Sequence, residues 1–538
     1  MRATPVVVVC LLLWLSEGLC AMADAPHEWT LEEARKHWKP MVRPVQHVGV
    51  PGDQFQAAVL WDGALAFGPL AFRDLGVMQR ELQPLGNNLL HVSVGYGEQM
   101  RFVDRRGTGS PAIQRSLDQG RLPIPHIETT EAGLLWHEMV FAHLLGRKPA
   151  DGMYPKPEDL LVVRARFWVQ NTSRQPNRGH LWLHFGDTSQ VSLGYKCRVG
   201  EQLAPALAHR FQAPFGLFQT KVRYVIPKPD KGRLIWHEEA VVSRDVAPPP
   251  TRVIEWEVRL QPNERAQLEL VIPYGPVDLT TAKRLLAMDS KELLREVRGF
   301  WVRVLDGAGQ ITTPDDFVND YLAAVVGQMA QQVAYRQHSD VWMYKTSPNH
   351  YEGYWPCNAA KALPTFDLRG LTALSRPVLE SFVEHQTDDV GTLGQERRPG
   401  REGDQVGGEG FERRPGFLGN FGEWTANTLL LSHGLELWAL ASHYRITRDD
   451  TWLGEGPGSP LQAIINACDW ISAQRRRTMR EEGGQKVAHW GLLPAASAHD
   501  WLSGNTIFND AYCIYGMAEA VRLLQEIGHP RAANWRRN

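Results

Sequence analysis

Cysteine is scarce in this sequence, and the charges of its acidic and basic residues almost cancel. These two features disfavour zinc-binding, nucleic-acid-binding and membrane-surface proteins. The 538 residues include six cysteines, none in a C-x-x-C pair, and a zinc site is therefore not expected. Four cysteines lie beyond residue 20, far apart in sequence, and we interpret them as buried free thiols: Cys197, Cys357, Cys468 and Cys513. The formal net charge of -2 gives no general attraction to nucleic acid or to an anionic membrane.

Long apolar runs and cofactor motifs are also missing beyond the N-terminus. No later segment is apolar enough to cross a membrane. No nucleotide-binding loop, metal cluster or Ser/His/Asp motif rises above chance, so we expect no cofactor. A calcium ion bound at a sugar pocket is the one alternative that the sequence does not exclude. The composition, 43% hydrophobic and 22% charged, is typical of a globular protein, and the length suggests two or more domains.

The first 23 residues resemble a secretory signal. Arg2 supplies a positive charge, residues 6–15 form a short apolar run, and the small residues at 21–23 fit a cleavage site after Ala23. A lipoprotein signal ending at Cys20 and a retained anchor are the alternatives. The sequence therefore predicts a secreted or periplasmic protein.

Residues 45–276 are predicted to form an antiparallel β-sandwich, because short alternating or apolar runs recur between turn-rich segments. The predicted strands are 57–67, 89–94, 133–144, 160–169, 180–185, 221–226, 233–242, 253–260 and 267–273. A barrel or a propeller is the alternative, but no fixed internal period supports a propeller. One turn, Asn171-Thr-Ser173, also matches a glycosylation acceptor, a tripeptide too common to carry weight alone.

Helical periodicity replaces the strand pattern from residue 277. Residues 277–312 are interpreted as a linker of one or two helices, and a further helix is predicted from Pro314-Asp-Asp316 to about Arg336. More helices are predicted at 359–368, 371–386, 425–445, 460–477 and 507–527, with a seventh beginning near Pro530. The charged, glycine-rich connection 387–423 is interpreted as a loop, with a lid over a pocket as the sharper alternative.

Three segments that combine aromatic and polar residues stand just before predicted helices. They are residues 351–358 (YEGYWPCN), 419–424 (GNFGEW) and 490–501 (WGLLPAASAHDW). Aromatic rings stack on the C–H faces of sugars, while Asp, Glu, Asn and His bond sugar hydroxyls. Two carboxylates that face such a pocket could also cleave a glycosidic bond. The segments therefore predict a carbohydrate site, with carbohydrate as the partner.

This order of segments resembles the six-hairpin glycosidases, the superfamily that includes the glucoamylase-like enzymes. The join at 300–315 (FWVRVLDGAGQITTPD) resembles the usual start of their helical domain. The resemblance implies a multidomain β + α protein: an N-terminal β-sandwich, a helical linker and an (α/α)6 toroid, whose first half would be residues 313–538. The toroid would need roughly 150–200 more residues to close, which implies a fragment or a true half-toroid.

The resemblance also implies where active-site residues lie, because loops that enter the inner helices form the active face of these enzymes. Cys357 and Asn358 occupy the places of an Arg and an Asp in a Trp-x-Arg-Asp pattern, and an amide cannot act as a proton donor in place of a carboxylic acid. By position on the third loop, Asp500 is the implied general acid. Glu423 competes with it, because its aromatic neighbours would raise the pKa of a carboxyl. The general base lies near the eleventh helix in the family, outside this sequence.

Nine residues are predicted to bind sugar: Tyr354, Trp355, Asn358, Trp424, Trp490, His499, Trp501, Asn509 and Asp510. Each also has a structural interpretation, since tryptophans are often core residues, and Asn509 and Asp510 could cap the helix that they begin. Glu423 and Asp500 could likewise stabilise helix N-termini, where negative charge is favoured.

The favoured hypothesis is an exported glycoside hydrolase that acts on an oligo- or polysaccharide with inversion, through two carboxylates about 6.5–9.5 Å apart. A non-catalytic carbohydrate-binding protein is the second hypothesis, motivated by Asn358 in place of the expected Asp. A polysaccharide lyase is the third, since Tyr354, Tyr512 and His499 could transfer protons, although such lyases usually place the toroid before the sandwich. The sequence indicates neither the sugar nor the oligomeric state.

Overall fold

The computed structural model describes most of the chain from Trp29 onward. The described residues are 29–37, 44–53, 57–67, 89–98, 101–103, 113–147, 159–186, 209–218, 220–238, 252–336, 341–347, 351–386, 391–393, 411–413, 416–418, 430–499 and 502–535. The predicted signal at residues 1–23 lies outside them. The backbone divides into two units, Met1–Pro44 and Val45–Asn538.

In the first unit, helix α2 (Leu31–His37) begins with a capping box. Thr30 Oγ1 accepts a hydrogen bond from Glu33 N at 3.3 Å, and Glu33 Oε2 accepts one from Thr30 N at 2.9 Å. These reciprocal bonds satisfy backbone donors that the start of a helix leaves free. They also hold the pKa of Glu33 below its usual value.

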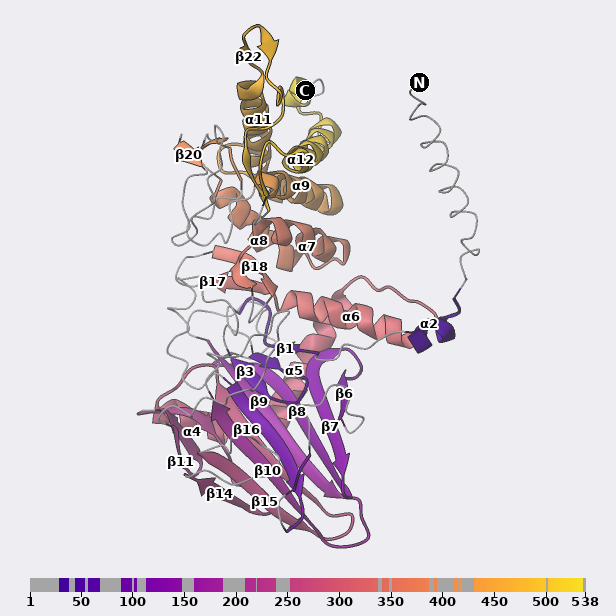
Figure 1. The fold of residues 1–538 in the computed structure, drawn as a ribbon, viewed down its shortest axis with the longest axis vertical. Coiled ribbons are helices and arrows are strands. Elements are labelled where there is room, and N and C mark those ends of the chain that lie inside the picture. Colours follow the sequence, from indigo (N-terminus) through magenta and orange to yellow (C-terminus); the bar gives the residue numbers. More distant parts are fainter. Residues whose placement is uncertain are drawn as a thin grey trace, which may run out of the picture. The chain divides into compact units, whose positions relative to one another are not determined.

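In the second unit, the strands between residues 46 and 273 form two antiparallel sheets of eight strands each (Figure 1). The first sheet has the order β1 (Gln46–Val48), β2 (Ala57–Val59), β3 (Leu65–Phe67), β4 (Leu89–Tyr96), β10 (Asn177–Gly186), β15 (Val253–Leu260) and β14 (Arg233–His237), with β5 (Arg101–Phe102) paired to β4. The second has the order β11 (His209–Gln212), β12 (Phe215–Phe218), β13 (Lys221–Val225), β16 (Arg265–Pro273), β9 (Leu160–Asn171), β8 (Leu134–Leu145), β7 (Leu122–Glu131) and β6 (Ile113–Asp118). The predicted antiparallel β architecture is confirmed.

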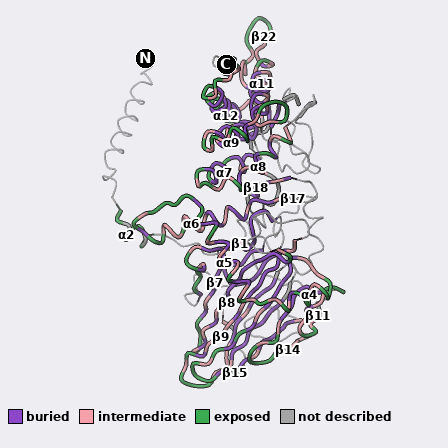
Figure 2. Tube along the Cα trace, turned by 180° about the vertical axis from the view of Figure 1, so that it is seen from behind, coloured by how far each residue is buried: buried purple, intermediate pink, exposed green. Residues whose placement is uncertain are grey.

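Side chains of the second sheet enter different cores on its two faces, because successive residues of a strand point to opposite faces. On β8, Val140 and Ala142 belong to the core shared with the first sheet, whereas Met139 and Phe141 belong to the core shared with the helices. Figure 2 shows buried positions following one another along β7, β8 and β9. Such continuous burial is expected for strands that are covered on both faces.

Two helices follow β16, the last strand of the two large sheets. Asp278 caps α4 (Leu279–Ala287) by accepting a hydrogen bond from Thr281 N at 2.7 Å, and Asp289 caps α5 (Ser290–Gly307) through Lys291 N at 2.8 Å. The apolar residues of α5 recur at helical spacing and join the core that also contains Met139 and Phe141: Leu293, Leu294, Val297, Phe300, Trp301, Val304 and Leu305. Helix α5 therefore packs on the outer face of the second sheet.

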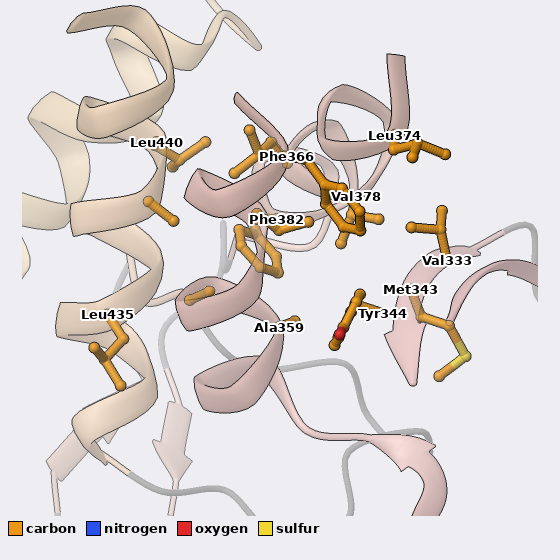
Figure 3. Close-up of a cluster of buried hydrophobic side chains, with 14 of the residues drawn as sticks. Val333, Met343, Tyr344, Ala359, Phe366, Leu374, Val378, Phe382, Leu435 and Leu440 are labelled. Carbon is orange, nitrogen blue, oxygen red and sulfur yellow. The ribbon is translucent and has the colours of Figure 1, made fainter. Parts of the chain in front are cut away.

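The remaining helices form a layered assembly with one continuous apolar core. They are α6 (Asp316–Ala330), α7 (Pro356–Leu368), α8 (Thr372–Glu384), α9 (Leu430–Thr447), α10 (Asp450–Leu453), α11 (Pro460–Thr478), α12 (Ile507–Glu526) and the 3₁₀ turn η4 (Pro530–Asn534). Figure 3 shows part of this core, where Phe366 of α7 and Phe382 of α8 lie between Leu435 and Leu440 of α9 and Met343 and Tyr344 of a neighbouring strand.

One predicted helix is too long, and a small sheet was missed. Helix α6 ends at Ala330 rather than near Arg336, and β17 (Val333–Arg336), β18 (Val341–Ser347) and β19 (Tyr351–Tyr354) form a three-stranded sheet. Strand β17 has partners on both sides. It pairs with β18 along its whole length, and on the other side Gly52 N donates to Val333 O at 2.8 Å and Gly52 O accepts from Tyr335 N at 3.0 Å. These pairings override the local helical spacing.

Other predictions need smaller corrections or lie partly outside the described residues. The predicted strand 57–67 is the hairpin β2–β3, and β1, β5, β6, β7, β11 and β12 match no predicted strand. Within the connection 387–423, the described residues include β20 (Gly391–Leu393), which pairs with β21 (Phe411–Arg413). Among the described helices, none is both long and apolar enough to cross a membrane.

Candidate functional site

Helices α7, α9 and α12 lie in one layer, and α7 and α12 carry Trp355, Asn358, Asn509 and Asp510 of the predicted site residues. Helix α9 packs against both α7 and α12. Cys513 Sγ of α12 lies 3.7 Å from Leu430 O of α9, and one turn further Gly516 meets Gly434. The contacts advance in the same direction along both chains, so α9 and α12 run parallel and their N-termini lie at the same end.

Glycine makes the close approach of α9 and α12 possible. A Cβ atom on Gly434 would overlap the carbonyl of Tyr512, and a Cβ atom on Gly516 would overlap the carbonyl of Gly434. Both obstacles are backbone atoms, which cannot rotate away as a side chain can. The two glycines therefore set the spacing between these helices.

Helix α7 begins directly after the small sheet and carries two predicted sugar-binding residues. Trp355 is its N-cap residue without a side-chain capping bond, and Pro356 starts the helix. Trp355 and Asn358 are both partly exposed, and Asn358 Oδ1 lies 3.7 Å from Cys357 Sγ. Tyr354 is the last residue of β19, and its side chain lies outside the described part of the structure.

A polar cluster joins the first turns of α7 to α9. Burial raises the pKa of the Cys357 thiol, the nearby Glu436 carboxylate raises it further, and Lys361 and the Ser432 hydroxyl oppose both effects. Glu436 is completely buried on α9, between Leu435 and Leu437. A carboxyl group between two leucines of a predicted helix is a signal that the sequence analysis missed, because buried Glu is rare unless it is paired or functional.

Lys361 connects this cluster to the third helix. It is exposed on α7, and its ammonium lies 5.5 Å from the centre of the Tyr512 ring of α12. The ring of Phe508 meets Tyr512 edge to face, with centroids 5.0 Å apart, and Phe508 is 46% exposed. Exposed aromatic and cationic groups therefore lie together near the start of α12.

Helix α12 holds the best-defined carboxylate among the predicted site residues. Thr506 caps the helix by accepting from Asn509 N, and Asn509 and Asp510 are buried in its first turns. Asp510 Oδ1 accepts a hydrogen bond from Leu493 N at 2.9 Å, and Asn505 Nδ2 donates to Leu493 O at 2.9 Å. The chain around Leu493, which belongs to the third aromatic segment, is thus held against the start of α12.

The second oxygen of Asp510, Oδ2, is buried and has no hydrogen-bond partner among the described residues. Burial raises the pKa of Asp510, while the N–H of Leu493 and the charge of Arg475 oppose the shift. An oxygen in this state favours a donor such as a sugar hydroxyl, because leaving it unpaired costs about 1–3 kcal/mol.

The other predicted site residues do not join this cluster: Trp490 lies elsewhere in the fold, and the rest lie wholly or partly outside the described residues. Trp490 lies in a turn near the hairpin of β22 (Glu481–Glu482) and β23 (Gln485–Lys486), where Lys486 Nζ is 4.6 Å from its ring centre. His499 is the last residue of β24 (Ala496–His499), which pairs with β25 (Leu502–Gly504), and only its backbone is described. Four predicted residues lie outside the described residues altogether: Glu423, Trp424, Asp500 and Trp501.

The chemistry of the described cluster suits a polyhydroxylated ligand. Amide, carboxylate, ammonium and aromatic groups from α7, α9 and α12 can donate to, accept from and stack on a sugar. Among the described residues, no group of three His, Cys, Asp or Glu side chains is placed to hold a metal ion.

No protein-family model and no curated protein sequence matches this chain. Among solved structures, it is similar to a GH92 α-mannosidase from Bacteroides thetaiotaomicron in complex with mannoimidazole, at 8% identity and a TM-score of 0.30, over 91% of this chain and 60% of the mannosidase. A second structure of that enzyme has 9% identity and a TM-score of 0.30, over 89% of this chain and 71% of the enzyme. A GH92-family glycosyl hydrolase has 10% identity and a TM-score of 0.26, over 91% of this chain and 59% of the hydrolase. The chain thus spans about 60% of the length of two of these structures.

Proposed function

We propose that this protein is an exported glycoside hydrolase whose sugar pocket lies at the start of α7, α9 and α12. The observation that carries the proposal is Asp510, a buried carboxyl with a raised pKa and one oxygen left without a described partner. Carboxyl groups that burial shifts in this way cluster at functional sites. Partly exposed Trp355 and Asn358 supply an aromatic face and an amide at the start of the neighbouring inner helix.

In this proposal the residues divide into a proton donor and a set of sugar-binding groups. Asp500 or Glu423 protonates the leaving oxygen, and a second carboxylate activates water on the opposite face of the sugar, which gives inversion. Asp510 and Asn509 bind sugar hydroxyls at the start of α12, while Trp355 stacks on a ring. The proposed organisation is a signal peptide at 1–23, a sandwich domain at 45–276, a linker at 277–312 and a toroid-type domain from 313.

The acid assignment is tested with single variants of the full-length protein. Asp500→Asn or Glu423→Gln should lower kcat about 10²–10⁴-fold, the usual contribution of a general acid. Asp510→Asn should mainly raise KM, by about 10–100-fold, because a hydrogen bond to a charged group contributes about 1.5–3 kcal/mol. Glu481→Gln, on the exposed hairpin, is the matched control and should leave both constants unchanged.

The assay is the release of reducing ends from a panel of polysaccharides, followed by nuclear magnetic resonance of the first product to read its anomeric configuration. Full activity in both Asp500→Asn and Glu423→Gln would show that neither residue is the acid. Sequencing the N-terminus of the protein recovered from the culture medium or periplasm tests export, and a mature chain beginning at residue 24 is expected.

A carbohydrate-binding protein without activity is the second candidate, and Asn358 favours it. This amide stands at the start of α7, where the resembling enzymes carry an Asp. Calorimetry on the same polysaccharide panel distinguishes the two functions. Saturable binding without any release of reducing ends supports the binding protein, whereas turnover that Asp500→Asn or Glu423→Gln abolishes supports the hydrolase.

A further inference from the structure

Arg223 is a completely buried cation, and an irregularity in strand β13 directs it inward. The pairing of β12 with β13 joins Gly216 to Tyr224 and Leu217 to Val222, so Arg223 is the extra residue of a β-bulge. Bulges of this kind redirect a side chain and are frequent beside functional sites. Its side chain is 0% exposed, although Arg is almost never fully buried unless it is paired.

Only one of the three guanidinium nitrogens of Arg223, Nη1, has a hydrogen-bond acceptor among the described residues. Nη1 donates to Pro273 O at 2.6 Å, and the group lies 4.8 Å from the centre of the Phe67 ring. Tyr274 meets the same ring edge to face, with centroids 6.0 Å apart. Within the described residues, Nε and Nη2 have no hydrogen-bond partner, and no carboxylate forms an ion pair with Arg223.

Arg164 is the other completely buried arginine among the described residues, and every nitrogen of its guanidinium has a hydrogen-bond partner. Its Nε donates to His143 at 3.1 Å, and its Nη2 donates to Leu285 O at 3.1 Å. Its Nη1 donates to Glu269 at 3.0 Å and to Ser290 at 2.9 Å, so each nitrogen has a partner and the charge has a counter-ion. Arg223 has neither on its Nε–Nη2 edge.

The free edge of Arg223 has the geometry that recognises an oxyanion. Nε and Nη2 lie on one side of the planar guanidinium, and their N–H groups can bind two oxygens of one carboxylate, phosphate or sulfate in parallel. Burial lowers the pKa of Arg223 only to about 10, so the side chain remains charged at neutral pH. A buried charge without a counter-ion is strongly unfavourable, and a bound anion would remove this cost.

We propose that Arg223 anchors a binding site for a small oxyanion at one end of the sandwich, in addition to the sugar pocket. Phe67 and Tyr274 form its apolar wall, and the occupant is a carboxylate-, phosphate- or sulfate-type group. Phe67 is the last residue of β3, and Pro273 is the last residue of β16. Phe67 pairs with Ala57 of β2, and Gly52, a few residues earlier in the chain, bonds to Val333 of β17.

The test is an anion titration of the protein after exhaustive dialysis into a chloride buffer. Sodium acetate, glucuronate, phosphate or sulfate is added at constant ionic strength, and the thermal midpoint and the heat of binding are measured. At least one oxyanion should raise the midpoint saturably, by a few degrees at about 100 times its Kd. The most effective probe identifies the source: glucuronate indicates an acidic sugar, and phosphate or sulfate a free ion.

Two arginine variants separate this site from general salt effects, which also raise the midpoint. Arg223→Met should lose the saturable response and be at least as stable as the wild type without oxyanion, because a costly buried charge is gone. Arg164→Met should lower the midpoint in every buffer, because it breaks a complete network, and should keep the anion response. Arg223→Lys keeps the positive charge but lacks the two parallel N–H donors of the guanidinium, so it should weaken oxyanion binding at least about tenfold.

Two results would overturn the proposal. If Arg223→Met responds to oxyanions as the wild type does, the site lies elsewhere or does not exist. If Arg223→Met lowers the midpoint in chloride as much as Arg164→Met does, Arg223 is already paired within the chain and needs no ligand. Both readouts are independent of sugar hydrolysis, so a failure of the proposed function would leave them interpretable.

Discussion

His443 Nδ1 of α9 lies 2.9 Å from Asp367 Oδ2 of α7, and both side chains are completely buried. Ser375 of α8 donates a short hydrogen bond to the other oxygen of Asp367. One carboxylate thus joins three consecutive helices of the layer that carries the candidate site. The ring of His443 also meets Trp452 of α10 edge to face at 4.3 Å.

Removing this carboxylate should destabilise the helical region strongly. Asp367→Ala leaves His443 without its buried partner and Ser375 with only Thr372 O as an acceptor, and breaking a buried pair costs about 3–5 kcal/mol. The thermal midpoint and the rate of limited proteolysis measure the effect. Asp469→Ala is the control, because Asp469 pairs with Arg531 at 2.6 Å on the surface and should cost no more than about 1 kcal/mol. Equal effects of the two substitutions would contradict the role of Asp367.

A second prediction concerns the spacing of α9 and α12. Gly434→Ala should lower both stability and sugar binding, because its methyl group meets the backbone of Tyr512 and forces the helices apart. Gly307→Ala is the matched control: Gly307 ends α5, nothing lies within 4 Å of its added Cβ, and alanine should stabilise by about 0.5–1 kcal/mol. Thermal midpoints and calorimetry with sugar measure the two effects. Wild-type binding by Gly434→Ala would show that the interhelical spacing does not position the site.

The third prediction is that Asn171 is a structural residue and not a glycosylation site. Its side chain is fully buried, and its Nδ2 donates to Gln175 O at 2.8 Å and to Leu260 O at 3.0 Å. Its Oδ1 accepts from the backbone and hydroxyl of Ser173, so the tripeptide forms a turn at the end of β9. A glycan on Nδ2 would remove one of these bonds and open the core.

Secretion from a eukaryotic host tests this. Mass spectrometry of the folded fraction should find Asn171 without a glycan, and Asn171→Ala should lower the thermal midpoint, since each buried group left unpaired costs about 1–3 kcal/mol. Thr172→Val, which keeps the Asn-x-Ser acceptor sequence and changes only its exposed middle residue, is the control: it should lack a glycan as well and be nearly as stable as the wild type, because it loses only the bond from Thr172 Oγ1 to Gly133 O. A stable, glycosylated protein would refute the structural role.

The sequence predicts those elements best whose local signals agree with their final environment. Helix α11 begins at Pro460, as predicted, because Ser459 caps it through Gln462 N at 3.1 Å and proline suits the first position. Strand β15 is found at the predicted residues, since its apolar run is covered on the core side. In both cases propensity, capping and burial favour the same structure.

Contacts between distant segments could not be predicted in this way. Strand β17 pairs with β18 and with the distant backbone of Gly52, whereas the local spacing alone favoured a continued helix. The cluster of Cys357, Lys361 and Glu436 depends on α7 packing against α9, which a single sequence does not indicate. The predicted aromatic residues could be named from the sequence, but it did not indicate that Trp490 lies beside the β22–β23 hairpin and not with Trp355.

The last prediction concerns acid sensitivity and depends on His433, which is neutral and completely buried on α9. Its Nδ1 accepts from Leu418 N at 2.9 Å, so its Nε2 carries the proton and donates to Ala467 O at 3.3 Å. Burial lowers its pKa from 6.5 to about 3. In the unfolded chain this imidazole binds a proton as the pH falls below 6.5, whereas in the folded chain it stays neutral down to about pH 3. The free energy of unfolding therefore decreases as the pH falls from 6.5 to 3.

His433→Asn should lower stability at pH 7, where the imidazole hydrogen bonds are lost, and should flatten the decline between pH 6.5 and 3. The slope contributed by one such proton is about 1.4 kcal/mol per pH unit. His137 and His143, whose pKa values burial also lowers to about 3, contribute to the same window and set the slope that remains. Thermal midpoints at pH 7, 6, 5 and 4 measure both effects, with His489→Asn, in a partly exposed turn, as the control. An acid decline as steep in His433→Asn as in the wild type would mean that His433 is protonated in the folded protein, and that the bond from Leu418 is absent.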